Sequence, residues 1–454
     1  MPHSSIVHDL RSAHSADALL TGVPLPTLLY FALPIILGNI FQQLYSIVDA
    51  IVVGNFLGDL PLSGISVASP IVDVANALVI GGTIGVGVLC AHYCGAGEGE
   101  RLRCMNATAL LGGGALTLLI ALCGIFFSTP LLRAQGTEEA VCREAAVYLQ
   151  LVFAGLLFCF LYNYYAAMLR SCGNSRTPFL ILLLSSTLHA LLDVLFVGVF
   201  GWGIRGVAFS TVLCQALAAA ACILYAQRRC PPLLLRPANL RFDRQMARLV
   251  LSYAWAAALQ QAVVCIGRLL VQGMLTPLGT STVTGYNMSL RTEQFLFCFS
   301  QGISAAMVVC LSQNLGHGDR PRARRFFRIS VLVELALIAL LGTVCFLFPA
   351  RIVGLFSDNA DVIAAGAQYT GAMAYLYVFA YLGEVIQGFF RGLGRLRLTM
   401  VASLLQVLLR VVLSYLLIPV WGMYGICAAV VSGWVLLAGI EGAYAVRKSS
   451  ALAA

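Results

Sequence analysis

The chain is poor in charged residues. Only 10% of its 454 residues are Asp, Glu, Lys or Arg, against about 25% in soluble domains. Hydrophobic residues make up 60% of the chain, and the mean hydropathy is +0.90. Because a soluble fold of this length could not hide so much apolar surface, the composition excludes a soluble protein and predicts an integral membrane protein.

Several chemical signatures are absent as well. The sequence has no Walker A motif, which argues against ATP as an energy source, and no nucleophile, base and orienter set that would indicate an enzyme. None of its fifteen cysteines forms a C-x-x-C pair. Cys90, His92 and Cys94 are close in sequence, but residues two apart on a helix point about 200° apart. We therefore expect no metal site there, and no cofactor beyond a coupling ion, H⁺ or Na⁺.

What the chain does contain is a series of long apolar runs. Twelve runs of roughly 20 residues each could cross a hydrocarbon core of about 30 Å. They are centred near residues 40, 73, 115, 157, 189, 215, 262, 297, 338, 375, 408 and 433. The fold class predicted is an all-α integral membrane protein with twelve transmembrane helices. Residues 1–24 are polar and lack the apolar core of a signal peptide, so we expect a short disordered tail there.

The net charge of +9 is distributed unevenly along the chain. If the N-terminus is cytoplasmic and the sides alternate, all but seven of the 28 Lys and Arg residues fall on cytoplasmic segments. This bias predicts a multi-pass protein of the cell membrane with both termini in the cytoplasm. The basic clusters are therefore interpreted first as topology signals that mark cytoplasmic segments, and contact with anionic membrane lipid is the secondary interpretation. Nucleic acid is not expected as a partner.

The chain repeats itself at an offset of 221 residues. Gly95-Ala96-Gly97-Glu98 returns as Gly316-His317-Gly318-Asp319, and Arg170 and Gly173 return as Arg391 and Gly394. We predict two pseudo-symmetric six-helix lobes related as parallel repeats around a central cleft, the build of many secondary transporters. The lobes are residues 25–226 and 246–446, joined by a cytoplasmic linker, 227–245, and followed by a cytoplasmic tail, 447–454.

Acidic side chains inside apolar runs indicate a functional site, because a charge at bilayer depth costs at least about 2.5–3.5 kcal/mol. By residue count, Asp49, Asp193 and Thr211 lie at a common depth, roughly 8–12 Å from the outer boundary. His189 is four residues before Asp193 and shares its helix face. We predict that these four residues form an ion-coupling site that holds a proton or a small cation. The alternative is a hydrogen-bonded knot that only ties helices together.

Other polar and aromatic residues in the spans are candidates for a substrate cleft. Glu293 and Arg410 both lie near mid-helix and are expected to pair, either facing the cleft or only neutralising the cost of inserting each charge. Glu334 and Glu384 are assigned structural roles, with Glu334 snorkelling towards its helix end. An apolar cavity with a few polar groups suits amphipathic ligands, and aromatic faces suit organic cations. The predicted cleft residues are Asn39, Gln42, Gln43, Tyr45, Tyr162, Asn163, Tyr165, Gln260, Gln261, Met274, Glu293, Tyr377, Tyr381 and Arg410.

The two halves differ at the predicted ion site. At the repeat offset, Asp49 corresponds to Leu270 and His189 corresponds to Arg410. The repeat has therefore kept its framework but not these side chains. We expect ion handling to be asymmetric and centred on the first half.

These motifs together resemble the multidrug and toxic compound extrusion (MATE) transporters over about residues 25–446. The strongest matches are Leu33-Pro34, Gln42 through Asp49, Val53-Gly54, Gly95 through Glu98, Leu192-Asp193 with Phe196, Gln313 through Gly316 with Gly318-Asp319, and Arg391 through Arg395. The resemblance implies two helix bundles, alternating access, and efflux of drug-like, often cationic compounds against inward flow of H⁺ or Na⁺.

The resemblance also assigns the ion site to Asp49, Asp193 and Thr211. Family members usually have Asn four residues before the second acid, where this chain has His189. Because imidazole is a poor Na⁺ ligand and a natural proton carrier, H⁺ coupling is favoured over Na⁺ coupling.

Two other functions are open on sequence grounds. A lipid-linked saccharide flippase of a related superfamily would need many cationic residues in its cleft, and only Arg268, Arg291 and Arg410 lie within spans. A membrane scaffold or receptor without transport would not need buried acids at matched depth. We therefore favour a multidrug antiporter that acts as a monomer on small drug-like molecules.

Overall fold

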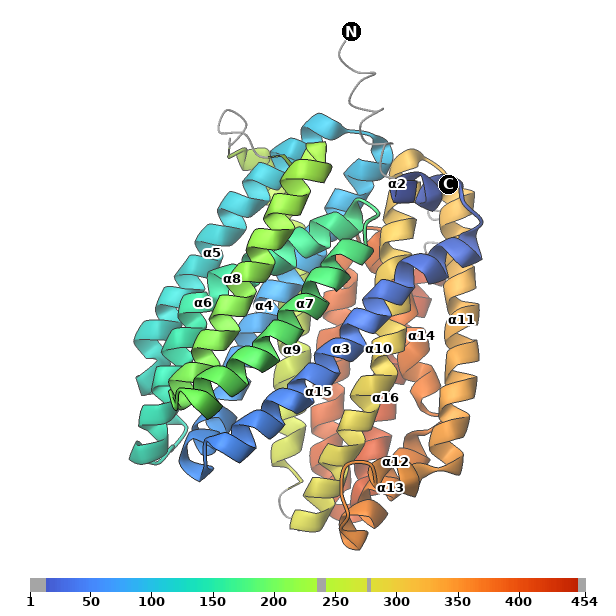
Figure 1. The fold of residues 1–454 in the computed structure, drawn as a ribbon. Coiled ribbons are helices and arrows are strands. Elements are labelled where there is room, and N and C mark those ends of the chain that lie inside the picture. The colour runs from blue at the N-terminus through green and yellow to red at the C-terminus, as the bar shows by residue number, and fades with distance from the viewer. Residues whose placement is uncertain (1–13, 235–241, 276–278, 448–454) are drawn as a thin grey trace. The chain divides into compact units, whose positions relative to one another are not determined.

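The computed structural model describes residues 14–234, 242–275 and 279–447. A few side chains inside helices, including those of Tyr45 and Asp49, lie outside the described residues. The elements of the described part are all helices (Figure 1). This confirms the predicted fold class as an all-α protein.

The first half of the chain contains most of the elements that build the candidate site. They are α2 (His14–Thr21), α3 (Pro24–Phe56), α4 (Asp59–Ala96), α5 (Gly99–Ala134), α6 (Glu139–Ser171), α7 (Arg176–Asp193), the π-helix η1 (Val194–Val199), α8 (Ile204–Arg229) and the short 3₁₀ helix η2 (Pro231–Leu233).

The second half begins with α9 and ends with α16. Its elements are α9 (Arg244–Gly273), α10 (Thr280–His317), α11 (Arg320–Leu347), α12 (Pro349–Val353), α13 (Ala360–Met373), α14 (Tyr377–Gly392), α15 (Leu396–Trp421) and α16 (Met423–Arg447).

The predicted spans are present as helices. Among the described residues, 11 helices are long and apolar enough to cross a membrane, and a bent pair makes a twelfth candidate. That pair is α13 and α14, which meet at 57° where the tenth apolar run was expected. No proline lies between Met373 and Tyr377, so the usual sequence signal for a broken helix is missing there.

The helices group into two compact units. The first contains α2, residues 33–262 and residues 312–319, and the second contains residues 24–32, 263–311 and the chain from 320 onwards. The N-terminal part of α9 belongs to the first unit because α4 packs tightly against it. A Cβ on Gly81 would lie 2.6 Å from the Ala257 carbonyl oxygen, and one on Gly85 would lie 2.4 Å from that of Tyr253. These glycines therefore allow the two backbones to touch.

The repeated glycine motifs end equivalent helices. Gly97 after α4 has φ +70°, and Gly318 after α10 has φ +89°. In both places the next residue's N–H reaches back to a carbonyl five residues earlier, from Glu98 to Tyr93 and from Asp319 to Asn314. This left-handed ending is one that glycine adopts without strain, which explains why Gly recurs at this offset.

A second repeated glycine makes a reciprocal contact in the first unit. A Cβ on Gly95 would lie 1.9 Å from the Gln313 carbonyl oxygen, and a Cβ on Gly316 would lie 2.1 Å from that of His92. Both glycines and both carbonyls are related by the same 221-residue offset. The end of α4 and the end of α10 therefore contact one another through equivalent backbone atoms.

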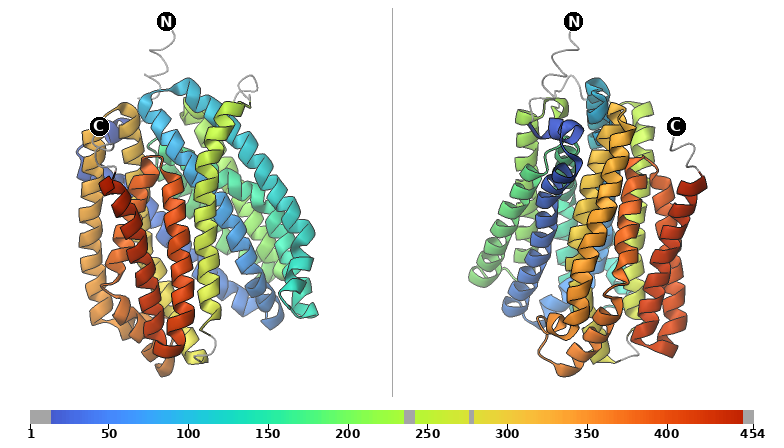
Figure 2. Two further views of the ribbon diagram at one scale, coloured as in Figure 1. Left: turned by 180° about the vertical axis from the view of Figure 1, so that it is seen from behind. Right: turned by 90° about the vertical axis from the view of Figure 1, so that its right-hand side faces the viewer.

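The second unit has its own core. Its largest fully buried side chains include Tyr286, Tyr369, Tyr377 and Tyr381. The helices α15 and α16 run side by side, as Figure 2 shows from behind. These packed aromatic rings hold α10, α13 and α14 against α16 and position the polar groups described below.

The predicted disordered tail is wrong for its last part. Residues 14–21 form α2, and Leu19 is buried. The Leu19 carbonyl accepts a hydrogen bond of 3.1 Å from the buried Asn314 side-chain amide. A buried amide requires such a partner, so this segment is ordered by a long-range contact that its own composition does not indicate.

Candidate ion-coupling site

Asp193 lies where an α-helix becomes a π-helix. It is the last residue of α7, and η1 continues the same segment to Val199. Insertions of π-helix into α-helices are rare and occur frequently at functional sites. The carboxyl group of Asp193 is fully buried, with 0% of the residue exposed.

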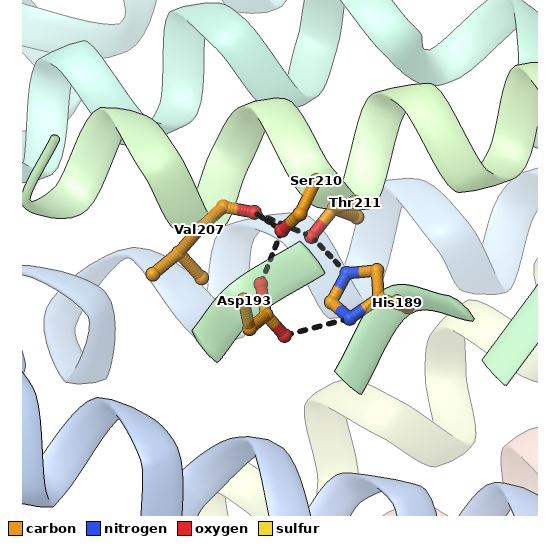
Figure 3. Close-up of polar contacts among 5 residues, drawn as sticks. All are labelled: His189, Asp193, Val207, Ser210 and Thr211. Carbon is orange, nitrogen blue, oxygen red and sulfur yellow. Dashed lines mark hydrogen bonds and ion pairs between the residues drawn. The ribbon is translucent and has the colours of Figure 1, made fainter. Parts of the chain in front are cut away.

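Three polar side chains from α7 and α8, those of His189, Ser210 and Thr211, gather around this carboxylate (Figure 3). The Nδ1 atom of His189 lies 2.7 Å from Asp193 Oδ2, and its Nε2 atom lies 2.9 Å from Thr211 Oγ1. The hydroxyl of Ser210 donates a short hydrogen bond to Asp193 Oδ1. The structure therefore brings together three of the four predicted ion-coupling residues, His189, Asp193 and Thr211.

The backbone of α8 also takes part in the cluster. The Val207 carbonyl oxygen lies 2.8 Å from Ser210 Oγ and 2.9 Å from Thr211 Oγ1. Each hydroxyl carries one hydrogen, so each can donate either to Val207 or into the cluster. Asp193 Oδ2 accepts no hydrogen bond among the described residues, and Nδ1 of His189 lies within hydrogen-bonding distance of it, at 2.7 Å.

An apolar contact ties α3 to the same place. Val53 packs with Val197 and Val207 in a small buried cluster. Val197 is four residues after Asp193, and Val53 is four residues after Asp49, so each valine lies one helical turn from a predicted ion-site position. The side chain of Asp49 lies outside the described residues, and its predicted place in the site stays a prediction.

The predicted cleft residues of the first unit have mixed surroundings. Tyr165 is buried against Tyr164 with their ring planes at 84°. Asn163 donates a 2.9 Å hydrogen bond to the Cys159 carbonyl. The other residues of this group range from buried to exposed, with Gln260 buried, Asn39, Gln43 and Tyr162 half-buried, and Gln42 and Gln261 exposed. The side chain of Tyr45 lies outside the described residues.

The second unit holds a separate buried polar cluster. Glu293 is 9% exposed, and its Oε2 accepts hydrogen bonds of 3.3 Å from the hydroxyls of Tyr369 and Tyr377. The hydroxyl of Tyr381 donates to the Leu296 carbonyl at 2.7 Å. Met274 is half-buried against the same core. Three of the predicted cleft residues, Glu293, Tyr377 and Tyr381, therefore lie within one cluster.

Glu293 and Arg410, which both belong to the described residues, do not form the expected ion pair. The guanidinium of Arg410 acts on Glu293 only as a nearby charge, as does that of Arg268. Tyrosine hydroxyls donate hydrogen bonds to the carboxylate instead. Buried tyrosines need hydrogen-bond partners themselves, and the sequence could not show that two of them would reach Glu293 from α13 and α14.

Of the two acids that were assigned structural roles from their positions near helix ends, one lies differently from the expectation. Glu334 does not snorkel, because it is 0% exposed and lies on α11 beside Ser300. Glu384 forms a 2.6 Å ion pair with Arg391, which agrees with a structural role. Sequence reasoning also missed Ser210, whose only signal is its position next to Thr211 on α8.

Three features are typical of a secondary transporter: an all-helical membrane fold, a duplicated framework and a buried acid paired with an imidazole. The sequence profile of the MatE family matches residues 34–195 and 256–416. The chain belongs to this family, the multidrug and toxic compound extrusion transporters.

Individual relatives are similar over most of the chain. The sequence is 27% identical to the probable multidrug resistance protein YpnP of Bacillus subtilis, over 85% of this chain and 86% of the relative. It is 23% identical to the probable multidrug resistance protein NorM of Thermotoga maritima, over 84% and 82%.

Solved structures share the fold. An outward-facing multidrug resistance MATE family transporter matches with a TM-score of 0.86 and 19% identity, over 96% of this chain and 98% of that one. A MOP superfamily transporter from Pyrococcus furiosus matches with a TM-score of 0.87, 19% identity and the same coverage. The predicted two-lobed, twelve-helix fold class is thereby confirmed.

Proposed function

We propose that this protein exports amphipathic, often cationic small molecules in exchange for protons. The relatives named as multidrug resistance proteins support the substrate class. The observation that supports proton coupling is the buried pair of His189 and Asp193, because these two side chains can hold a proton by themselves. Because of the charge bias, we further propose that both termini lie in the cytoplasm. We also propose that the protein acts as a monomer in the cell membrane.

The hydrogen-bond pattern suggests how one proton enters the site. If the Thr211 hydroxyl donates to the Val207 carbonyl, its oxygen can only accept, so Nε2 of His189 must carry a hydrogen. Nδ1 and the Asp193 carboxylate would then be two acceptors 2.7 Å apart, and they need a proton between them. This arrangement is the proton-loaded state.

Rotation of the same hydroxyl gives the unloaded state. When Thr211 donates to His189 Nε2 instead, the neutral imidazole carries its hydrogen on Nδ1 and donates it to the Asp193 carboxylate. The two states differ by one proton and by the direction of one hydroxyl. A ligand that favours one of them can shift the balance between access states. Asp49 would contribute to the same balance, since Val53, one turn away, packs against the site.

Proton coupling can be measured directly in proteoliposomes. Uptake of ethidium, an amphipathic cation, would be driven by an imposed pH gradient or, separately, by an imposed Na⁺ gradient. We expect the pH gradient alone to drive transport. Asp193→Asn should reduce that rate about 5–150-fold, because a coupling energy of about 1–3 kcal/mol is lost.

The repeat provides the matched control for this experiment. Ser414 occupies the position of Asp193 in the second half and is also fully buried. Ser414→Ala should leave the response to the pH gradient unchanged. Undiminished transport by Asp193→Asn protein would show that this carboxyl does not carry the coupling proton.

The coupling ion itself depends on His189 in this proposal. His189→Asn replaces a titratable ring by an amide whose oxygen can ligate Na⁺ alongside the Asp193, Ser210 and Thr211 oxygens. We expect the variant to lose the response to the pH gradient and to gain a response to Na⁺. A variant that still responds to the pH gradient alone would count against the imidazole as the proton carrier.

A further inference from the structure

Three cysteines meet at the C-terminal ends of α4 and α6. Cys90 and Cys94 lie one turn apart on α4, and Cys172 directly follows α6. Their three Sγ atoms all lie within 4.8 Å of one another, and Cys94 Sγ is 3.3 Å from Cys172 Sγ. Cys90 is fully buried, whereas Cys94 and Cys172 are half-buried. The cluster is thus closed on one side and reachable on the other.

The spacing fits a metal ion bound by three sulfurs. A metal–sulfur bond of about 2.3 Å places thiolate sulfurs roughly 3.8–4.0 Å apart, which these side chains can reach with small rotations. Soft thiolate ligands select ions such as Zn²⁺ and Cu⁺. A disulfide would instead need two sulfurs at about 2.05 Å and would leave the third thiol unused.

The surrounding structure holds the cluster in place. Ser171, next to Cys172, donates from its hydroxyl to the Gly87 carbonyl at 2.8 Å. Its own carbonyl accepts a 2.6 Å hydrogen bond from the Gln313 side-chain amide. The first bond fixes the end of α6 to α4, and the second fixes it to the end of α10. Metal sites depend on such support around their ligands.

The repeat argues that the cysteines are not needed for packing. At the offset of 221 residues, Cys90, Cys94 and Cys172 correspond to Leu311, Leu315 and Leu393. The same helix ends therefore accept three leucines in the other half. Three separate positions carry thiols in the first half only, and all three converge.

We propose that Cys90, Cys94 and Cys172 bind one thiophilic metal ion of the Zn²⁺ or Cu⁺ class. Binding converts the three thiols to thiolates and releases their three protons to water. The site differs from the proposed ion-coupling cluster in residues, ligand chemistry and position along the helices. His92 lies between Cys90 and Cys94 on α4 and is not one of the three ligands, because Cys172 supplies the third sulfur.

The test uses Cd²⁺ as a spectroscopic probe on purified protein kept anaerobic and free of added thiol. Thiolate-to-cadmium charge-transfer absorbance should saturate at one ion per chain, and Zn²⁺ and Cu⁺ should displace Cd²⁺. Cys94→Ala or Cys172→Ala should weaken binding by more than the roughly 10–100-fold that loss of a supporting residue costs.

Controls separate this site from the other thiols. Cys142→Ala and Cys159→Ala remove buried cysteines of the same unit outside the cluster, and they should leave the titration unchanged. The triple variant Cys90→Leu, Cys94→Leu, Cys172→Leu copies the second half and should fold while losing the absorbance. Equal absorbance in that variant, no saturation at one ion in the parent protein, or a Cys94–Cys172 disulfide under anaerobic conditions would overturn the proposal. The titration needs no transport, so its outcome is independent of drug export.

Discussion

The two halves of this chain share a framework but differ in their buried polar chemistry. In the first half, a carboxylate on α7 contacts an imidazole and a hydroxyl. In the second half, the positions of Asp193 and His189 hold Ser414 and Arg410. The buried acid there is Glu293 on α10, and it is held by two tyrosines.

The difference shows what the duplication preserved. Equivalent glycines still end equivalent helices, and Gly95 and Gly316 still make equivalent contacts. Backbone contacts of that kind tolerate almost no change, because any side chain would overlap a carbonyl oxygen. Side chains inside each unit could diverge, so one half came to hold a titratable pair and the other a permanent positive charge.

The largest effect is expected when a diverged residue of the first half is replaced by its counterpart from the second half. His189→Arg copies the second half into the first. Because arginine stays protonated in proteins, we expect the pH-gradient-driven rate of ethidium transport to fall at least about tenfold, the loss of a coupling energy above 1.4 kcal/mol.

The reciprocal exchange is the control. Arg410→His should not create a second proton-coupled site, because Ser414 offers no carboxylate one turn away. The measurement is the number of protons moved per ethidium, from a pH-sensitive dye inside the vesicles. A ratio that rises in the Arg410→His protein would contradict the asymmetry proposed here.

Substitutions at the preserved glycine contacts should have an intermediate effect on stability, of similar size in both halves. Gly95→Ala and Gly316→Ala each force a Cβ to about 2 Å from a backbone oxygen, and overpacking of this kind costs typically about 1–3 kcal/mol. The measurement is thermal unfolding of the detergent-solubilised protein, monitored as the fraction that stays monodisperse. Both variants should lose a similar amount of stability.

Gly82 supplies the matched comparison, since a Cβ there would meet nothing within 4 Å. Gly82→Ala should leave the unfolding midpoint unchanged or raise it, because alanine favours helix. If Gly95→Ala were as stable as Gly82→Ala, the close approach of α4 to the Gln313 backbone would be wrong.

The smallest effect is expected at Glu293. Its carboxylate already accepts two tyrosine hydrogen bonds, so it is only partly available to a cationic substrate. Glu293→Gln keeps an oxygen to which both tyrosines can donate and removes only the charge, so the KM for ethidium should rise by about fivefold or less, a loss of about 1 kcal/mol. A neutral substrate should show no change, and an equal change for both would point to a structural role alone.

Much of the architecture could be predicted because lipid imposes a simple rule on sequence. A helix that crosses a bilayer must be apolar over about 20 residues, so twelve runs predicted twelve candidate spans. Asp193, His189 and Thr211 could be brought together by counting residues along α7 and α8, since helical rise is constant.

Other features depended on contacts between segments far apart in the chain. The break between α13 and α14 has no proline, and α2 is ordered by Asn314 rather than by its own composition. The π-helix after Asp193 and the capture of Glu293 by tyrosines likewise leave no local pattern in the sequence.

The sequence by itself therefore determined the lipid environment, the number of candidate spans and the duplication, because each follows from local composition or from repeated motifs. It also placed His189 and Asp193 on one helix face, because the twist of a helix is fixed. Only the tertiary structure decided which side chains pair. It placed Cys172 against Cys90 and Cys94 and gave Glu293 two tyrosines in place of Arg410. Pairing depends on how helices rotate and approach one another, and that is set by packing across the whole unit rather than by neighbours in the chain.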